Sequence, residues 1–208
     1  VNGIKIVDIY SKTEYNKCMK NIVLASGNAG KIAEFKAILK NYNILAPKDL
    51  GIKFEADETG TSFYENAYIK AKALYELCDL PTLADDSGLC VDALGGAPGI
   101  YSARYSGGTD SDNNAKLLRE MENASDRTAY FESCIVYYDG EHTVAASGRT
   151  YGKIAQKESG SGGFGYDPLF VSDDLGKTFG EASEAEKNSV SHRARALAAL
   201  AEQLTDLL

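Results

Sequence analysis

The sequence has few of the residues that bind a metal through sulfur or imidazole. Its 208 residues include two histidines and four cysteines, and no two cysteines form a Cys-x-x-Cys pair. A structural zinc site usually needs such pairs or more histidines, so this composition argues against one. Widely spaced single cysteines are typical of buried thiols in a reducing cytoplasm, and here they are Cys18, Cys78, Cys90 and Cys134.

Positive charge is also scarce. The chain has 22 Lys and Arg against 30 Asp and Glu, which gives a net charge of -8. A surface that follows a nucleic-acid backbone is basic, so we expect no nucleic-acid polymer as a partner. A small anionic ligand is compatible with this balance, because a few cations can gather locally on an acidic protein.

Long apolar runs are absent as well. No stretch approaches the roughly 18 apolar residues of a membrane span, and the N-terminus lacks an apolar segment followed by a cleavage site. We therefore expect a cytoplasmic protein with no membrane partner. Residues 1–18 are charged and polar, and Met19 follows them directly. We interpret residues 1–18 as an extension that is poorly ordered or precedes the natural start.

The chain does contain enough apolar sequence for a core. With 44% hydrophobic residues, a chain of this size buries roughly 70% of its unfolded surface and needs no disulfide or metal to fold. We expect one domain over residues 19–208. Apolar spacing predicts strands at 21–26, 44–46, 82–84, 128–138, 142–150 and 169–171, and helices at 31–42, 63–78, 110–121 and from about 191. This alternation, with a two-residue hairpin turn at Asp139-Gly140, predicts an α/β fold with a mixed sheet.

A glycine turn leads from the first predicted strand into the first predicted helix, at residues 26–31 (Ser-Gly-Asn-Ala-Gly-Lys). Glycines let the backbone approach a ligand, the first helical N–H groups point at it, and Lys31 supplies charge for a phosphate. The P-loop pattern is absent. Since such a sequence is more often only a turn, we favour that interpretation on these residues alone.

Two adjacent carboxylates, Asp85 and Asp86, follow the predicted strand at 82–84. Open α/β sheets bind ligands at the carboxyl ends of their strands, and carboxylates there suit Mg²⁺, which keeps water and phosphate as its other ligands. The alternative is an Asp-rich turn bonded to backbone amides. The apolar context favours the chemical interpretation. Glu58 could supply a further carboxylate, although by itself it fits a solvated loop.

Two later segments combine backbone freedom, aromatic rings and charge. Residues 162–168 (Gly-Gly-Phe-Gly-Tyr-Asp-Pro) could present a ring for stacking on a base, or could equally be a turn with core aromatics. Lys187, His192 and Arg193 crowd the predicted start of the last helix, where acidic residues are usual. Such a cluster of donors indicates an anionic or acceptor-rich partner rather than three solvated charges.

Together these segments resemble the inosine/xanthosine triphosphate pyrophosphatase family, the Ham1-like nucleotidases. Six motifs occur in the family's order, at residues 26–31, 61–70, 85–89, 95–104, 164–167 and 191–193. The resemblance implies an elongated mixed sheet flanked by helices, two lobes with a cleft between them, and a homodimer. The implied reaction is hydrolysis of the α–β bond of deaminated purine nucleoside triphosphates (ITP, dITP, XTP) to monophosphate and pyrophosphate, with Mg²⁺ as cofactor.

The resemblance also implies roles on the phosphate side. Asp86 would be the catalytic general base or metal ligand that activates water, Glu58 a second Mg²⁺ contact, and Asp85 their support. We expect Lys31 and Lys70, with the glycine turn, to hold the triphosphate.

On the base side, the resemblance implies that Lys187, His192 and Arg193 face the purine. These donors match its 6-oxo group and not the 6-amino group of adenine. We expect Phe164 to stack on the base and Asp167 to lie at its edge. The complete expected substrate-binding set is Ser26, Gly27, Asn28, Ala29, Gly30, Lys31, Lys70, Ser87, Phe164, Gly165, Tyr166, Asp167, Lys187, His192 and Arg193.

Two other interpretations stay open at this point. A related Maf-like pyrophosphatase would act on other modified nucleotides, although the Ser-His-Arg sequence at 191–193 argues against it. A nucleotide sensor would bind without turnover, but a binder gains nothing from clustering Asp85 and Asp86 beside phosphates without a metal. A substrate panel and a product assay distinguish the three.

Overall fold

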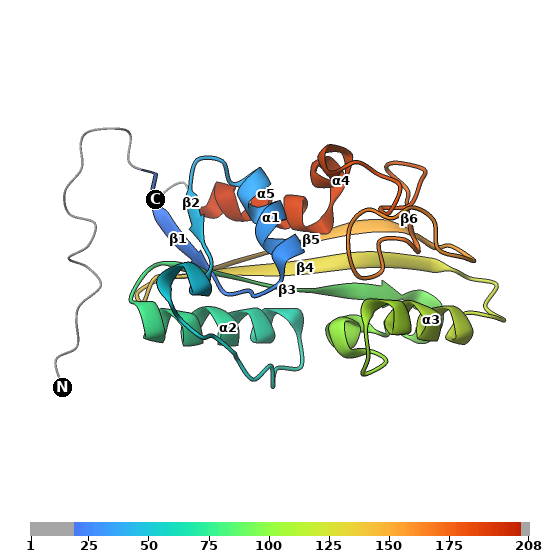
Figure 1. Ribbon diagram of the computed structural model, residues 1–208, viewed down its shortest axis with the longest axis horizontal. Coiled ribbons are helices and arrows are strands. Elements are labelled where there is room, and N and C mark those ends of the chain that lie inside the picture. The colour runs from blue at the N-terminus through green and yellow to red at the C-terminus, as the bar shows by residue number, and fades with distance from the viewer. Residues whose placement is uncertain (1–18, 205–208) are drawn as a thin grey trace.

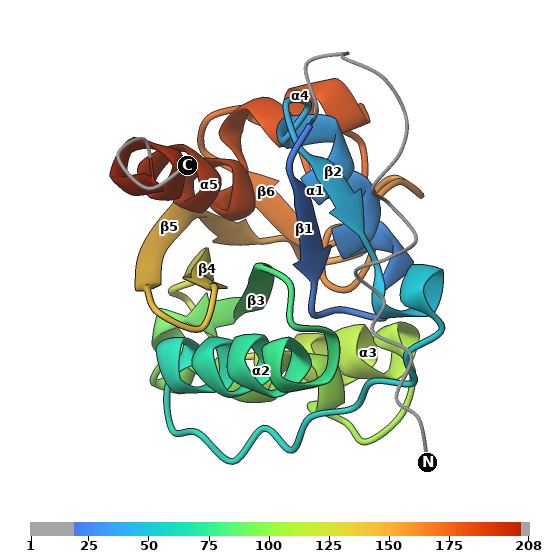
Figure 2. The same cartoon turned by 90° about the vertical axis from the view of Figure 1, so that its left-hand side faces the viewer.

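The computed structural model describes residues 19–204. The expected extension at residues 1–18 lies outside the described residues. The described part contains a six-stranded sheet with the order β2-β1-β3-β4-β5-β6 (Figures 1 and 2). Its strands are β1 (Asn21–Leu24), β2 (Asn43–Leu45), β3 (Thr82–Val91), β4 (Thr128–Tyr138), β5 (Thr143–Ile154) and β6 (Phe170–Ser172).

The sheet is mixed, as the sequence predicts. β1 pairs in parallel with β2 and β3, whereas β3, β4, β5 and β6 are antiparallel neighbours. The β4–β5 hairpin turns over residues 139–142, because Tyr138 pairs with Thr143. The predicted two-residue turn at Asp139-Gly140 lies one position too early: the Asp139 N–H group donates to the His142 carbonyl oxygen over 3.3 Å, and the Asp139 carboxylate accepts from the backbone N–H groups of Glu141 and His142.

Helices cover both faces of the sheet. α1 (Ala29–Ile38), α4 (Glu184–Val190) and α5 (His192–Leu204) lie on one face, and α2 (Phe63–Cys78) and α3 (Asp110–Glu120) on the other (Figures 1 and 2). α2 begins as predicted, with the Ser62 side chain accepting a hydrogen bond from the Glu65 N–H group. None of the described helices is long and apolar enough to cross a membrane.

The core has a separate region on each face of the sheet. Leu83 packs against α1 and α5 with Phe35 and Leu197, whereas its neighbour Ala84 packs against α2 with Leu74. This difference follows from the strand itself, because successive residues of a β-strand point to opposite faces. The same alternation governs the two residues that follow Ala84. A third apolar region, around α3 and β6, fills the other end of the sheet.

The cysteines within the described residues are buried and unpaired. Cys78, Cys90 and Cys134 are free thiols, and burial raises the pKa of each. Cys18 lies outside the described residues. Raised thiol pKa values make these side chains behave as small apolar groups.

Candidate active site

Asp85 and Asp86 lie inside a strand. The sequence placed them after a strand that ends at residue 84, and this was wrong: β3 continues to Val91 and pairs with β4 along its whole length. A strand that is predicted from a run of apolar residues ends at the first charged residue. Here each carboxylate is matched by cations from elsewhere in the fold, so the strand can continue. Because Asp85 and Asp86 are neighbours on a strand, their side chains point to opposite faces of the sheet.

One edge of β3 becomes free of a neighbouring strand beyond β1. The last backbone hydrogen bond from the β1 segment to this edge runs from the Ala25 N–H group to the Leu83 carbonyl oxygen, over 2.7 Å. The next carbonyl oxygen on the edge, that of Asp85, accepts from the Lys70 ammonium at 3.1 Å and from the Lys31 ammonium at 3.4 Å. Two positive charges therefore converge where strand pairing stops.

Asp86 lies on the α2 face of the sheet, in one cluster with the Glu58 carboxylate and with two side chains of α2. The Lys70 ammonium is 2.8 Å from Asp86 Oδ1 and 2.7 Å from Glu58 Oε1. Asn66, which the sequence analysis missed, donates from Nδ2 to Asp86 Oδ2 over 3.3 Å. Burial raises the pKa of Asp86, and the opposing effect of Lys70 does not cancel it. A carboxylate with a raised pKa is a better proton acceptor.

Asp85 lies on the α1 and α5 face and is wholly engaged by donors. Its Oδ2 atom is 2.8 Å from the Lys31 ammonium and 2.9 Å from Arg193 Nη2, and Ser87 donates to it over 3.1 Å. Ser133 donates to Oδ1 over 2.5 Å. Burial alone would raise the pKa of Asp85, but Arg193 and Lys31 hold it well below its usual value. Asp85 is therefore an ionised anchor for cations and a poor proton acceptor.

Glu34 joins the cations on this face and was not predicted. This residue of α1 accepts from Arg193 Nη1 and lies 2.7 Å from the Lys187 ammonium. Lys187 is also 2.6 Å from Asp167 Oδ2. The sequence does hold a signal for Glu34: it is a charged residue three positions after Lys31, on the buried side of a helix.

Lys187 does not lie at the start of the last helix. The sequence placed it there with His192 and Arg193, but the structure has a separate helix, α4, that ends at Val190. Ser191 separates α4 from α5, and its side chain accepts a hydrogen bond from the Ala194 N–H group over 3.1 Å. Lys187 thus belongs to the last turn of α4, where the helix dipole favours a cation. His192 and Arg193 do begin α5.

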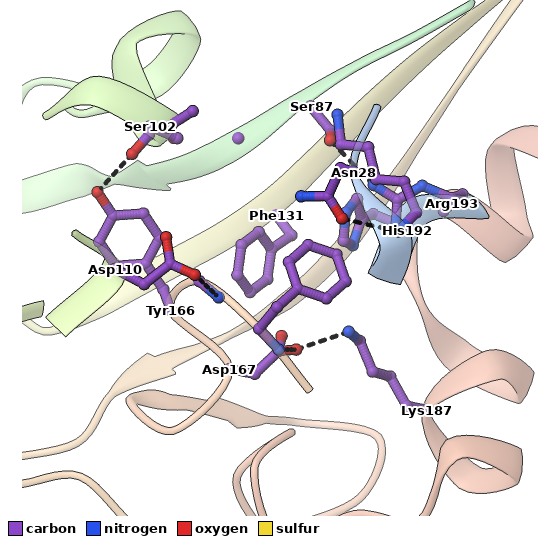
Figure 3. Close-up of a pocket in the computed structure, with 15 residues that line it drawn as sticks. Asn28, Ser87, Ser102, Asp110, Phe131, Tyr166, Asp167, Lys187, His192 and Arg193 are labelled. Carbon is purple, nitrogen blue, oxygen red and sulfur yellow. Dashed lines mark hydrogen bonds and ion pairs between the residues drawn. The ribbon is translucent and has the colours of Figure 1, made fainter. Parts of the chain in front are cut away.

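A pocket opens beside these charges (Figure 3). The rings of Phe131 and Phe164 form part of its wall, and His192 stacks on Phe131 with centroids 4.9 Å apart and planes 15° apart. The predicted site residues that line it are Asn28, Lys31, Ser87, Phe164, Gly165, Tyr166, Asp167, Lys187, His192 and Arg193. Lys70, Glu58 and Asp86 are not among its lining residues and form the adjoining cluster on the other face of β3.

His192 and Arg193 differ in what they can offer a ligand. Arg193 is 1% exposed and donates to Asp85, Glu34 and Ser87. The His192 Nδ1 atom is buried without a hydrogen-bond partner within the described residues. Burial and the neighbouring Arg193 hold the pKa of His192 well below its usual value, so the ring is neutral at pH 7. His192 is the member of this pair with an uncommitted polar atom.

The turn that carries Phe164 is held by its own residues and by the opposite side of the pocket. Asp167 accepts a hydrogen bond from the Phe164 N–H group over 2.8 Å, and the Lys187 ammonium lies 4.5 Å from the Phe164 ring centroid. The Tyr166 side chain is buried, and its hydroxyl donates to the Ser102 carbonyl oxygen over 2.9 Å (Figure 3). A Cβ atom at Gly30 would lie 2.6 Å from the Phe164 ring, so this glycine makes room for the ring.

The remaining predicted residues shape the turn before α1. The Ser26 hydroxyl accepts from the Asn28 N–H group over 3.2 Å, and the Asn28 side chain accepts from the Lys31 N–H group over 3.0 Å. Asn28 is thereby the N-cap of α1. Gly27 and Ala29 contribute backbone to the same turn. The turn positions Lys31 between the pocket and the free edge of β3.

Glu58 and Asp86 are the carboxylates that suit a metal ion. In the part of the chain that the structure describes, no group of three or more His, Cys, Asp or Glu side chains gathers that could hold one. Mg²⁺ is commonly held by one or two carboxylates, with water and substrate phosphates as its other ligands. The donor set therefore fits a cation that binds together with a phosphate.

Comparison with known proteins places the chain in a family. A model of the Ham1 family matches residues 22–203. The chain belongs to the Ham1 family. The dITP/XTP pyrophosphatase of Ralstonia nicotianae is 50% identical over 196 residues, which cover 89% of this chain and 97% of the relative. The dITP/XTP pyrophosphatase of Escherichia coli K12 is 45% identical over 195 residues, which cover 89% of this chain and 98% of the relative.

Solved structures of Ham1 proteins have the same fold. The Ham1 protein of Staphylococcus aureus superposes with a TM-score of 0.81 at 41% identity, covering 91% of this chain and 100% of that one. The HAM1 protein of Coxiella burnetii also gives a TM-score of 0.81, at 38% identity, and the match covers 90% of this chain and 100% of that one. The resemblance inferred from six short motifs and the predicted α/β fold are both confirmed.

Proposed function

We propose that this protein hydrolyses the α–β bond of ITP, dITP and XTP, releasing the monophosphate and pyrophosphate and so removing deaminated purines from the nucleotide pool. Relatives of nearly the same extent carry the name dITP/XTP pyrophosphatase. The observation that carries the proposal is the division of Asp85 and Asp86 between the faces of β3. Asp85 holds the cations of the pocket, and Asp86 holds the lysine of the adjoining cluster. A site divided in this way can bind a purine at one end and phosphates at the other.

Lys31 and Lys70 connect the two ends. Both ammonium groups reach the Asp85 carbonyl oxygen, one from α1 and the other from α2. A triphosphate lying along this edge would meet both charges. Phosphoryl transfer depends chiefly on positioning and on neutralising the phosphate charge, which is what two fixed ammonium groups supply.

Asp86 is the residue that we assign to the attacking water. Its Oδ2 atom is held by Asn66 and its Oδ1 atom by Lys70, so the carboxylate has a fixed orientation. Glu58 and Asp86 would hold Mg²⁺, which when bound neutralises charge on the phosphates. The raised pKa of Asp86 suits a group that accepts a proton from water.

His192 and Phe164 are the residues that we assign to the base. The Phe164 ring offers a stacking surface for the purine. The neutral imidazole of His192 can present an N–H group to the 6-oxo oxygen of hypoxanthine or xanthine. Adenine carries an amino group at that position, and a buried donor left unpaired against it disfavours binding.

The proposal is tested by incubating the protein with ITP, XTP, ATP and GTP and assaying pyrophosphate and orthophosphate separately. We expect pyrophosphate from ITP and XTP, with ATP turned over far more slowly. Orthophosphate as the first product would assign cleavage to the β–γ bond instead. Tight binding with no product in Mg²⁺ would indicate a sensor, and preference for modified pyrimidine nucleotides would indicate a Maf-like enzyme.

We further propose that the protein is a homodimer in the cytoplasm. The family resemblance supports the dimer, and the buried free thiols are compatible with a reducing compartment. Light scattering on the purified protein should give about twice the chain mass of 22.4 kDa. A mass equal to that of one chain would contradict the dimer.

A further inference from the structure

The motif at residues 95–104 enters the site as described so far only through Ser102, which accepts a hydrogen bond from Tyr166 and lines the pocket. It ends in Arg104, the last residue of the short 3₁₀-helix η4 (Gly99–Arg104). Arg104 Nη1 lies 3.0 Å from Glu58 Oε2, and its guanidinium carbon lies 5.3 Å from the centroid of the Tyr101 ring. Arg104 thus contacts one of the two carboxylates that suit a metal ion.

Both oxygens of Glu58 are engaged by cations. Lys70 occupies Oε1 and Arg104 occupies Oε2. A metal ion on Glu58 would compete with these two cations for the charge and the lone pairs of the carboxylate. Lys70 and Arg104 differ in the free energy that breaking the contact with Glu58 would require.

Lys70 is the partner that stays. Its side chain is 10% exposed, and its ammonium also bonds Asp86 Oδ1 and the Asp85 carbonyl oxygen. Moving it would leave buried polar groups unpaired. The Arg104 side chain is 46% exposed and has the Tyr101 ring as a second contact. An exposed ion pair contributes little free energy, so Arg104 can leave Glu58 at low cost.

We propose that Arg104 is a pyrophosphate-binding residue that exchanges Glu58 for the β- and γ-phosphates when the nucleotide binds. This rests on the proposed function, because it assumes that the phosphates lie beside Glu58 and Asp86. A guanidinium group matches phosphate oxygens with two parallel N–H donors, which an ammonium group cannot do. The exchange frees Glu58 Oε2 and delivers a positive charge to the group that leaves.

The experiment is calorimetric titration of pyrophosphate, with Mg²⁺ present, into the wild-type protein and two variants. Arg104→Gln removes the proposed contact. Arg149→Gln is a matched control, because Arg149 is 47% exposed, pairs with Glu132 over 2.9 Å and lies 4.7 Å from the Tyr130 ring centroid. Inosine monophosphate is titrated in parallel as a ligand without the outer phosphates.

We expect Arg104→Gln to raise the pyrophosphate Kd about tenfold, the effect of losing a charge-assisted hydrogen bond. Its affinity for inosine monophosphate should stay at the wild-type value, and Arg149→Gln should bind both ligands normally. A pyrophosphate Kd within twofold of wild type in Arg104→Gln, or an equal loss for both ligands, would overturn the assignment. Wild-type protein that neither binds nor releases pyrophosphate would instead refute the proposed function, and Arg104's role with it.

Discussion

Replacing Asp85 with asparagine (Asp85→Asn) should destabilise the fold far more than the same change one residue later (Asp86→Asn). The two carboxylates are adjacent in sequence but point to opposite faces of β3. Asp85 is bonded to Arg193, Lys31 and Ser133. The two variants therefore apply the same chemical change to two buried carboxylates that have different surroundings.

The expected magnitudes follow from burial and partners. The Asp85 side chain is 0% exposed and that of Arg193 1% exposed. Removing one member of a buried ion pair costs about 3–5 kcal/mol, because the other charge is left uncompensated. Arg193 keeps Glu34, so we expect the lower end, about 3 kcal/mol, or a fall in Tm of about 10 °C for a chain of this length. Burial already disfavours the charge of Asp86, and Lys70 keeps Glu58, so Asp86→Asn should cost at most about 1 kcal/mol.

The assay is urea unfolding of both variants and the wild type, followed by far-ultraviolet circular dichroism at pH 7. A lower midpoint with an unchanged slope would report a change in stability alone. Equal losses in the two variants, or a loss in Asp85→Asn of less than about 1 kcal/mol, would refute the reasoning. The ion pairs around Asp85 would then contribute no more than exposed ones.

Three further expectations concern the cations and His192. Lys31→Ala and Lys70→Ala should each lower kcat/KM for ITP by at least about tenfold, since phosphate charge is held in both ground and transition states; losses within about twofold would remove them from phosphate binding. His192→Phe should reduce turnover of ITP more than residual turnover of ATP, because it removes the donor that we assign to the 6-oxo group; equal losses would remove His192 from base recognition. The fold lowers the pKa of His192. Below a pH of about 6.5 the unfolded chain therefore binds a proton that the folded protein does not bind. The free energy of unfolding falls in that range by up to about 1.4 kcal/mol for each pH unit of acidification. Urea unfolding at pH 7 and pH 5 should show a smaller loss in His192→Phe than in the wild type, and an equal loss would contradict a neutral, buried His192.

The local features of the fold could be predicted from the sequence because their causes are local. Ser62 caps α2 through a residue three positions away, and Asn28 caps α1 in the same way. The capping box of α4, formed by Ser183 and Glu186, has the same spacing. That helix was missed although its signal is present, because it is short and runs almost directly into α5.

The course of β3 could not be predicted, because what permits it lies far away in the sequence. Asp85 is bonded to Arg193, 108 positions later, and to Lys31, 54 positions earlier. Glu34 and Arg193 are 159 positions apart. A single sequence gives no sign that such residues meet, so the two aspartates were interpreted as the end of a strand. Most of the residues that line the pocket were named from the motifs, which identify residues without giving their arrangement.

The most direct test of the division of roles across β3 is the turnover of ITP by Asp86→Asn. If Asp86 acts on the attacking water, kcat should fall by about 10²–10⁴-fold. The Kd for inosine monophosphate, measured by calorimetry, should stay within about threefold of wild type, because the pocket lies on the Asp85 side. Near-normal turnover by Asp86→Asn would contradict the assignment and place the chemistry on another residue.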